Sequence, residues 1–122
     1  TAEMIKYMNN LFFATKVSFL NEMKLLGDKV GVDWSDAVEG FILDGRIGHS
    51  HLAVPGPDGK FGFGGSCFPK DIQALINFGK ENNVDMNVLK GAWETNLVVR
   101  PERDWEQLKG RAVASDAKKS TE

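Results

Sequence analysis

A run of helical periodicity over residues 2–30 constrains what this chain can fold into more than any other feature. Its apolar side chains recur at steps of three or four residues, the period of a helix, at Met4, Met8, Leu11, Phe19, Met23, Leu26 and Val30. Such a helix is roughly 40 Å long, whereas globular helices average about 11–12 residues. In a chain of 122 residues two interpretations stay open: a central core helix, or a helix with a second surface for a partner.

Three shorter helices are predicted downstream. Asp33 is a favourable N-cap for a helix that ends near Ile42, and apolar periodicity predicts helices over about 69–82 and 87–99. The positions expected to face inward in the last two are Ile72, Leu75, Ile76, Phe78, Val88, Leu89, Ala92, Trp93 and Leu97. No stretch has the alternation of a strand. The sequence therefore predicts an all-α fold, a helical bundle around one long N-terminal helix.

The segment 43–66 separates the second of these helices from the third. It is rich in glycine and contains Pro55 and Pro57. A loop of this length is unusual in a compact domain, and such loops are commonly functional or disordered. We expect it to be the loop of an active site.

Composition narrows the classes of function. The net charge of −2 offers no electrostatic basis for binding nucleic acid or an anionic membrane, and no apolar run reaches the ~20 residues that a membrane helix needs. A single cysteine cannot form an internal disulfide, which fits a cytoplasmic protein. One domain is expected over 1–110, with a last short helix opened by Pro101 and closed by Gly110. The polar residues 111–122 are expected to be a frayed tail or the start of an interdomain linker.

The residues most informative about function are Gly62-Phe63-Gly64-Gly65-Ser66-Cys67-Phe68-Pro69-Lys70-Asp71. Because proline favours the start of a helix, Cys67 is expected at or just before a helix N-terminus, where unpaired N–H groups and the helix dipole stabilise a thiolate. Gly64 and Gly65 let a ligand approach the backbone closely, and Asp71 follows the thiol by one helical turn. A buried structural cysteine is the alternative, but these features together favour a catalytic thiol.

A polar strip runs beside the apolar residues of the first helix. Lys6 and Asn10 are four residues apart and lie near Glu3 on one face. Taken alone, they fit an ordinary solvated face with a weak surface ion pair.

Other polar and aromatic side chains have simpler interpretations. His49 and His51, with Asp58, lack the spacing of zinc ligands, so no metal site is predicted. The three tryptophans are expected to be packing residues; they are Trp34, Trp93 and Trp105.

Three segments together resemble the UDP-glucose/GDP-mannose dehydrogenase family, most closely its UDP-glucose 6-dehydrogenase branch. Glu3-Met4-Ile5-Lys6-Tyr7-Met8-Asn9-Asn10 resembles the family's E-x-x-K-x-x-x-N helix, and Asp44-Gly45-Arg46-Ile47-Gly48 its D-x-R-I-G turn. The cysteine run resembles its active-site segment. The segments occur in the family's order, and the resemblance covers about residues 2–109, which would be the central domain. The separation from Lys6 to Cys67 is a few residues longer than is usual in the family. The extra length falls in a turn-rich loop at 55–60, and such loops tolerate insertion.

The resemblance implies a mechanism. The family oxidises the C6 alcohol of a nucleotide sugar to a carboxylate with two NAD⁺ in succession. Cys67 would add as a thiolate to the aldehyde, the thiohemiacetal would give the second hydride, and the thioester would be hydrolysed. Lys6 would stabilise the alkoxide, Asn10 would hold a water or the sugar oxygen, and Asp71 would orient or deprotonate water or help set the charge of Lys6.

The resemblance also implies partners. Arg46 would reach across a homodimer, formed through residues 2–30, to the substrate of the other subunit. Phe63, Gly64, Gly65 and Glu3 would contribute to the site for UDP-glucose or a related nucleotide sugar.

The cofactor of the family is not expected to bind mainly here. The glycines do not form G-x-G-x-x-G between a strand and a helix, so NAD would be bound mainly by a domain absent from this chain, and the chain alone would not turn over. Two alternatives stay open. One is a GDP-mannose 6-dehydrogenase, and the other is a non-catalytic dimerisation module that kept the motif.

Overall fold

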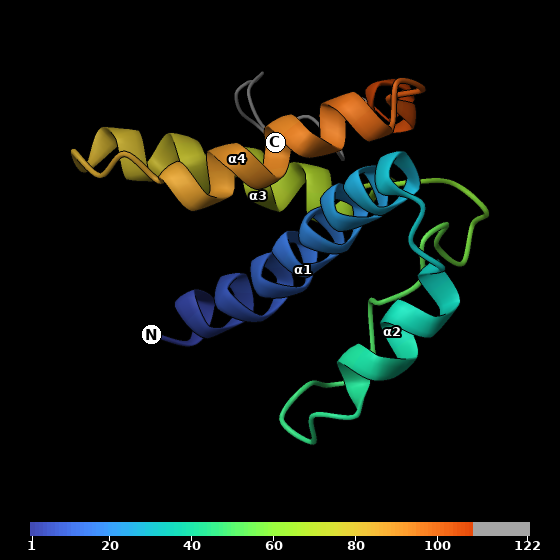
Figure 1. The fold of residues 1–122 in the computed structure, drawn as a ribbon. Helices are drawn as coiled ribbons and strands as arrows, with labels where there is room; N and C mark the ends of the chain where they lie inside the picture. The colour runs from blue at the N-terminus through green and yellow to red at the C-terminus, as the bar shows by residue number, and fades with distance from the viewer. Residues whose placement is uncertain (109–122) are drawn as a thin grey trace.

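The fold is a small assembly of helices, seen in a computed structural model that describes residues 1–108 (Figure 1). Its helices are α1 (Ala2–Val30), α2 (Trp34–Ile42), α3 (Cys67–Glu81) and α4 (Asn87–Val99), followed by the 3₁₀ helix Asp104–Gln107. The described residues contain no strand. The all-α prediction and the bounds of the long first helix are therefore confirmed, whereas Gly110 and the predicted tail at 111–122 lie outside the described residues.

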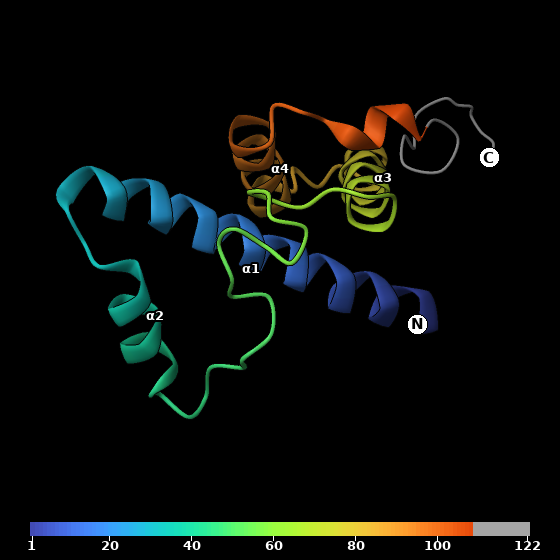
Figure 2. The same cartoon turned by 90° about the vertical axis from the view of Figure 1, so that its right-hand side faces the viewer.

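α1 is the axis on which the other helices are arranged. α3 and α4 pack against it and against each other, and α2 contacts it near its C-terminal end (Figures 1 and 2). The segment from 43 to 66 then passes beside α1 on its way to α3 (Figure 2). This arrangement brings the first turn of α3 and the preceding glycines next to α1 and α4.

Local sequence explains where the first two helices end and begin. Gly31 terminates α1 in the left-handed conformation, with φ +81°, and its amide donates to the carbonyl of Gly27, which is a common helix stop. Asp33 caps α2, as predicted, because its carboxylate accepts a hydrogen bond of 3.0 Å from the amide of Asp36.

Two apolar clusters form the core, and the long loop contributes to both. The larger cluster joins α1, α3 and α4 around Phe63 of the loop; its buried members are Leu11, Ala14, Phe63, Ile72 and Ala92. The smaller cluster joins α1 to the loop through Leu20, Leu52 and Val54, with Trp34, Ile42 and Phe61 packed against it. Trp93 packs against the larger cluster and lies 5.1 Å from the ring of buried Trp105, so the tryptophans are packing residues, as expected.

α1 buries one face and exposes another apolar face. The buried positions include Leu11, Ala14, Ser18 and Asn21. Most of the apolar side chains that define its periodicity point outward, and neighbouring Phe12 does too. Those that are at least half exposed are Met4, Met8, Phe12, Phe19, Leu26 and Val30. α1 is therefore a core helix that also carries an uncovered apolar surface. Within the described residues, none of the helices combines the length and apolarity needed to span a membrane.

Three predicted details of the helices are wrong. Phe78 and Val88, expected inward, are 55% and 72% exposed. α3 turns Ile72, Leu75 and Ile76 toward the core, and α4 turns Leu89 and Ala92. The two exposed residues lie beside these buried faces. Periodicity predicts which spacing the buried residues follow, but not how wide the buried face is. Pro101 opens a turn rather than a helix, because Arg103 has φ +45° and the 3₁₀ helix starts only at Asp104.

Candidate active site

Cys67 is the first residue of α3 and its thiol is free and exposed. Ser66 precedes it as the N-cap residue, and its side chain makes no capping hydrogen bond. Pro69 is buried in the first turn, where its missing N–H costs nothing. The helix therefore begins two residues earlier than the proline suggests, and its unpaired N–H groups and positive dipole end lie at the cysteine.

Asn10 and Asp71 connect the first and third motif segments. The Asn10 Nδ2 atom donates a hydrogen bond of 3.0 Å to Asp71 Oδ2 across 61 positions of sequence, and both residues are half-buried. Asp71 follows Cys67 by one turn of α3. The fold thus brings together two of the side chains singled out from sequence, and one of them lies one helical turn from the residue that carries the thiol.

Lys6 and Glu3 lie farther along α1, and both are exposed. An open groove of about 1100 Å³ is lined by Glu3 and Tyr7 of α1 and by the second half of α3. These lining residues show that α3 runs toward the N-terminal end of α1. Lys6 and Cys67 consequently lie on either side of the Asn10–Asp71 contact, each one turn away from it along its own helix. Any approach between them depends on the long, flexible lysine side chain.

Buried asparagines hold residues 58–65, the glycine-rich segment, in place. Asn96 of α4 is fully buried; its Oδ1 accepts from the amide of Phe63 at 2.7 Å, and its Nδ2 donates to the carbonyl of Phe63 at 2.9 Å. Asn21 of α1 accepts from the amide of Gly62 at 3.0 Å. Phe63 itself is buried and meets Phe68 and Trp93 at ring distances of 5.8 and 6.1 Å. Phe63 is therefore a core residue in this chain.

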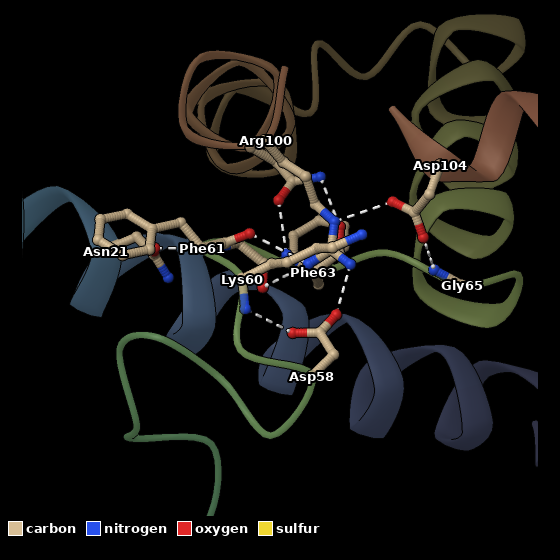
Figure 3. A network of polar contacts seen from close by, with 10 residues as sticks. Asn21, Asp58, Lys60, Phe61, Phe63, Gly65, Arg100 and Asp104 are labelled. Atoms are coloured by element: carbon tan, nitrogen blue, oxygen red, sulfur yellow. Dashed lines mark hydrogen bonds and ion pairs between the residues drawn. The ribbon is translucent and has the colours of Figure 1, made fainter. Parts of the chain in front are cut away.

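Arg100 lies just past the end of α4 and is the charged centre of the segment's polar contacts (Figure 3). It is only 2% exposed. Its Nη1 donates to the carbonyls of Phe61 and Gly62 at 3.1 and 3.4 Å, and its Nη2 donates to Asp58 Oδ2 at 2.5 Å. One guanidinium thus binds three positions of a segment that lies about 40 residues earlier in sequence.

Asp104 extends this network to Gly65 (Figure 3), two residues before Cys67 in the sequence. Its Oδ1 accepts from Arg100 Nε at 2.8 Å, and its Oδ2 accepts from the amide of Gly65 at 3.0 Å. The ion pair also fills the space beside Gly64, where an added Cβ would lie 2.5 Å from Arg100 Nη2 and from both Asp104 oxygens. Gly65, with φ +72°, has nothing within 4 Å of its Cβ position. The space on the Cβ side of Gly65 is therefore open, whereas that of Gly64 is filled.

The network shifts the ionisation of its members. The hydrogen bond from Arg100 is the largest cause that lowers the pKa of Asp58. Burial alone would raise the pKa of Asp104, but the Gly65 amide and Arg100 outweigh it and lower that pKa. Burial likewise opposes the charge of Arg100, and the two carboxylates still raise its pKa. The three groups are therefore held in their charged forms.

Arg46 lies in the loop after α2, on the outside of the molecule. Its side chain is 90% exposed and is paired with Asp44 through two hydrogen bonds, Nε to Oδ1 at 3.0 Å and Nη2 to Oδ2 at 2.7 Å. This side-chain hydrogen bonding lowers the pKa of Asp44. Lys16 of α1 fastens the same turn by donating to the carbonyl of Gly48 at 2.8 Å. Arg46 is thus presented to the surroundings and does not contact the thiol of its own chain.

One of the two loop histidines, His51, contacts an aromatic ring of α1, whereas His49 is exposed. His51 stacks on Phe13 with ring centroids 4.4 Å apart, and burial, followed by the charge of Lys16, lowers its pKa. Within residues 1–108, no group of three or more His, Cys, Asp or Glu side chains is placed to hold a metal ion.

Sequence reasoning missed the side chains that hold the glycine-rich segment. Asn96 and Arg100 follow Ala92 at steps of four residues, so they continue the inward face of α4. A polar residue on an otherwise apolar helix face is the available signal, since buried polar groups need partners. The partners themselves could not be predicted, because they are backbone atoms of a distant loop.

Comparisons with known proteins show which family this chain resembles. Residues 1–97 match the model of the UDP-glucose/GDP-mannose dehydrogenase family, central domain. The chain is 47% identical over 96 residues to the UDP-glucose 6-dehydrogenase of Rickettsia prowazekii (strain Madrid E), covering 79% of this chain and 21% of that protein. It is 39% identical over 117 residues to the UDP-glucose 6-dehydrogenase of Rhizobium meliloti (strain 1021), covering 96% of this chain and 24% of that protein.

A solved structure leads to the same family. The UDP-glucose dehydrogenase from the hyperthermophilic archaeon Pyrobaculum islandicum matches with a TM-score of 0.73 and 38% identity, over 89% of this chain and 25% of that one. The chain thus spans between 21% and 25% of the length of these relatives. With the family model matched over residues 1–97 and the sequence and structural relatives in agreement, the chain belongs to the UDP-glucose/GDP-mannose dehydrogenase family and represents its central domain.

Proposed function

We propose that this chain is the substrate-binding centre of a UDP-glucose 6-dehydrogenase and that Cys67 is its nucleophile. The hydrogen bond between Asn10 and Asp71 carries the proposal, because it joins the polar strip of α1 to the helix that begins with the exposed thiol. The sequence relatives described above are named UDP-glucose 6-dehydrogenases, which favours UDP-glucose over GDP-mannose as the substrate.

The chain's own residues supply the covalent steps. The Cys67 thiolate adds to the carbonyl carbon of the C6 aldehyde, forming a carbon–sulfur bond while the carbonyl electron pair moves to oxygen. Lys6 stabilises that developing alkoxide. Loss of the second hydride from this adduct, to an acceptor bound elsewhere in the protein, would leave a thioester. In the last step a water held by Asn10 and Asp71 attacks the thioester; the carbon–sulfur bond breaks, the carboxylate forms and the thiol is released.

NAD is assigned to another part of the protein. It supplies the hydride acceptor that the oxidations need, but the glycine-rich segment does not fit a dinucleotide. The positions where Cβ atoms of Gly62 and Gly64 would lie are occupied by Asn96 and by the Arg100–Asp104 pair, and no strand precedes the glycines within the described residues. A phosphate cradle needs both the strand and free space beside the glycines.

We also propose that residues 2–30 form a homodimer interface. Ile5, Met8, Phe12, Phe19 and Leu26 form an apolar stripe along α1 whose members are between 50% and 67% exposed. Contiguous apolar surface of this kind favours association, and a two-fold axis would cover it with its own copy. Such a dimer would give the exposed Arg46 access to the substrate of the other subunit.

A hybrid enzyme tests the catalytic proposal. Residues 1–108 would replace the matching segment of the Rhizobium meliloti UDP-glucose 6-dehydrogenase, and NADH formation would be followed with UDP-glucose. We expect activity that Cys67→Ser abolishes. Activity with GDP-mannose alone would favour the alternative substrate. A folded hybrid that binds NAD but is inactive with both sugars would contradict the proposal and favour a non-catalytic module.

A further inference from the structure

The segment 58–65 is held from both sides by charged and polar groups that no motif of the family resemblance includes. It lacks regular secondary structure, yet it bonds to Asn21 of α1, Asn96 of α4 and Arg100 beyond α4. Irregular loops tend to be mobile because few contacts order their backbone. This segment leads directly to Cys67, so its order determines how the thiol is presented.

Arg100 has the chemistry for fixing this backbone. Its fork of N–H donors is planar and rigid, and each of the three nitrogens is used: Nη1 for two loop carbonyls, Nη2 for Asp58 and Nε for Asp104. A buried ion pair is by itself weak evidence for stability, because desolvation offsets much of the attraction. What this cation supplies is geometry, since one rigid group sets the relative positions of Asp58, the 61–62 backbone and Asp104.

Asp104 links Arg100 to the backbone next to Cys67. Its second oxygen binds the amide of Gly65, two residues before Cys67. The same ion pair excludes a side chain at position 64, while the Cβ side of Gly65 stays open. The space beside Gly64 is thus filled by Arg100 and Asp104, whereas the space beside Gly65, next to Ser66, is open.

We propose that Arg100 is a positioning residue for Cys67: with Asp104 it fixes the backbone of residues 58–65 and so holds the thiol at the head of α3 with the Gly65 side open to a ligand. The inference rests on the proposed catalytic role of Cys67. Arg100 itself does not touch the reacting atoms; it acts through the loop.

Arg100→Lys tests the proposal, because it keeps the positive charge and most of the length but loses the planar fork. Arg103→Lys is the matched control, since Arg103 lies three residues away on the surface in a loose pair with Glu106, 3.6 Å apart. Amide hydrogen exchange would be measured on the 122-residue chain. Alkylation of its single cysteine by iodoacetamide would be timed in buffer and in urea. Neither measurement needs NAD or a nucleotide sugar, so a failed hybrid enzyme would leave this test intact.

In Arg100→Lys we expect the amides of Gly62, Phe63 and Gly65 to exchange about tenfold faster, because charge-assisted bonds are lost. The exchange of α1 and α4 should stay unchanged. We also expect the ratio of alkylation rates in buffer and in urea to move toward one, as the thiol loses its fixed surroundings. Arg103→Lys should match the parent in both measurements.

Two results would overturn the inference. One is an Arg100→Lys chain whose loop exchange and alkylation ratio equal those of the parent. The other is faster exchange spread evenly over all helices, which would make Arg100 a general stabilising residue. If Arg100→Lys does not fold, Asp104→Asn takes its place with the same readouts, because it removes the charge and one of the two acceptors that link Arg100 to Gly65.

Discussion

Asn96 does for Phe63 what a neighbouring strand does in a sheet: it satisfies both the amide and the carbonyl of one residue. The primary amide group is suited to this because it carries a donor and an acceptor side by side. Phe63 can therefore bury its ring in the core without leaving its backbone unpaired. Phe63 lies in irregular structure, yet both of its backbone groups are hydrogen-bonded, as they would be in a β-sheet.

Asn96→Ala is expected to destabilise the chain by about 2 kcal/mol or more, because it leaves two buried backbone groups of Phe63 without partners. Urea unfolding followed by circular dichroism measures the change. Asn77→Ala is the control, since Asn77 is exposed on α3 and should change the free energy of unfolding by less than about 0.5 kcal/mol. Equal effects of the two substitutions would contradict the role given to Asn96.

Acid is expected to weaken the network around Arg100. The pKa values of Asp58 and Asp104 are lower in the folded chain than the ordinary value of 3.8, so the unfolded chain binds more protons in acid. Their contribution to stability is therefore fully present above pH 3.8 and is lost as the pH falls through the lower, folded values.

Urea unfolding at a series of pH values checks this prediction. Asp104→Asn should show a shallower loss of stability at acid pH than the parent chain. Glu106→Gln, a change at an exposed carboxylate two residues away, should follow the parent. An acid dependence that Asp104→Asn leaves unaltered would show that the pKa of another group governs it.

At the scale of elements, two glycines of the glycine-rich segment share a backbone conformation but differ in the space around them. Gly62 and Gly65 both have positive φ, +70° and +72°, so an alanine at either position costs about 1 kcal/mol of backbone strain. A Cβ at Gly62 would also collide with Asn96 and approach Val99 Cγ2 at 3.0 Å, whereas at Gly65 it would meet open space.

Gly62→Ala is accordingly expected to be the more destabilising change, by about 1–3 kcal/mol beyond Gly65→Ala. Thermal unfolding of the two variants side by side provides the comparison. Gly65→Ala is instead expected to hinder a ligand at the open side of the backbone. If both variants melt together, the space beside Gly62 is not filled as the structure indicates.

The helices could be predicted from sequence, and the contacts around the loop could not. Periodicity and capping act within one or two turns, so Asp33 and the bounds of α1 and α4 follow from neighbouring residues. The contacts made by Asn96 and Arg100 join positions separated by 33 to 42 residues. They depend on how the helices pack, which no local pattern encodes. The functional candidates came from short motifs, whereas the side chains that bind the backbone before Cys67 lie outside these motifs; they are Asn21, Asn96, Arg100 and Asp104.

At the scale of the whole molecule, the outward apolar face of α1 predicts self-association. Phe19→Glu places a charge in the centre of this face, and because Phe19 is 50% exposed the change should leave the single chain folded. We expect the parent to sediment as a dimer at micromolar concentration and Phe19→Glu as a monomer, since a buried unpaired charge is costly.

Val88→Glu is the control for that experiment. Val88 is 72% exposed on α4, away from the proposed interface, so this variant should remain dimeric. A parent chain that sediments as a monomer, or a folded Phe19→Glu chain that stays dimeric, would exclude this face of α1 as the interface.

The position of Arg100 and Asp104 separates two meanings of a domain boundary. The match to the family model ends at residue 97. Two of the residues that order the segment before Cys67, Arg100 and Asp104, lie beyond it, as does Trp105, which is 2% exposed and packs against Trp93. A fragment cut at residue 97 would retain all three motif segments and lose Arg100 and Asp104, which bind the backbone before Cys67. The segment that the family model matches is thus shorter than the segment whose contacts order the backbone before the thiol. A graft of this centre into another enzyme therefore has to include Arg100 and Asp104.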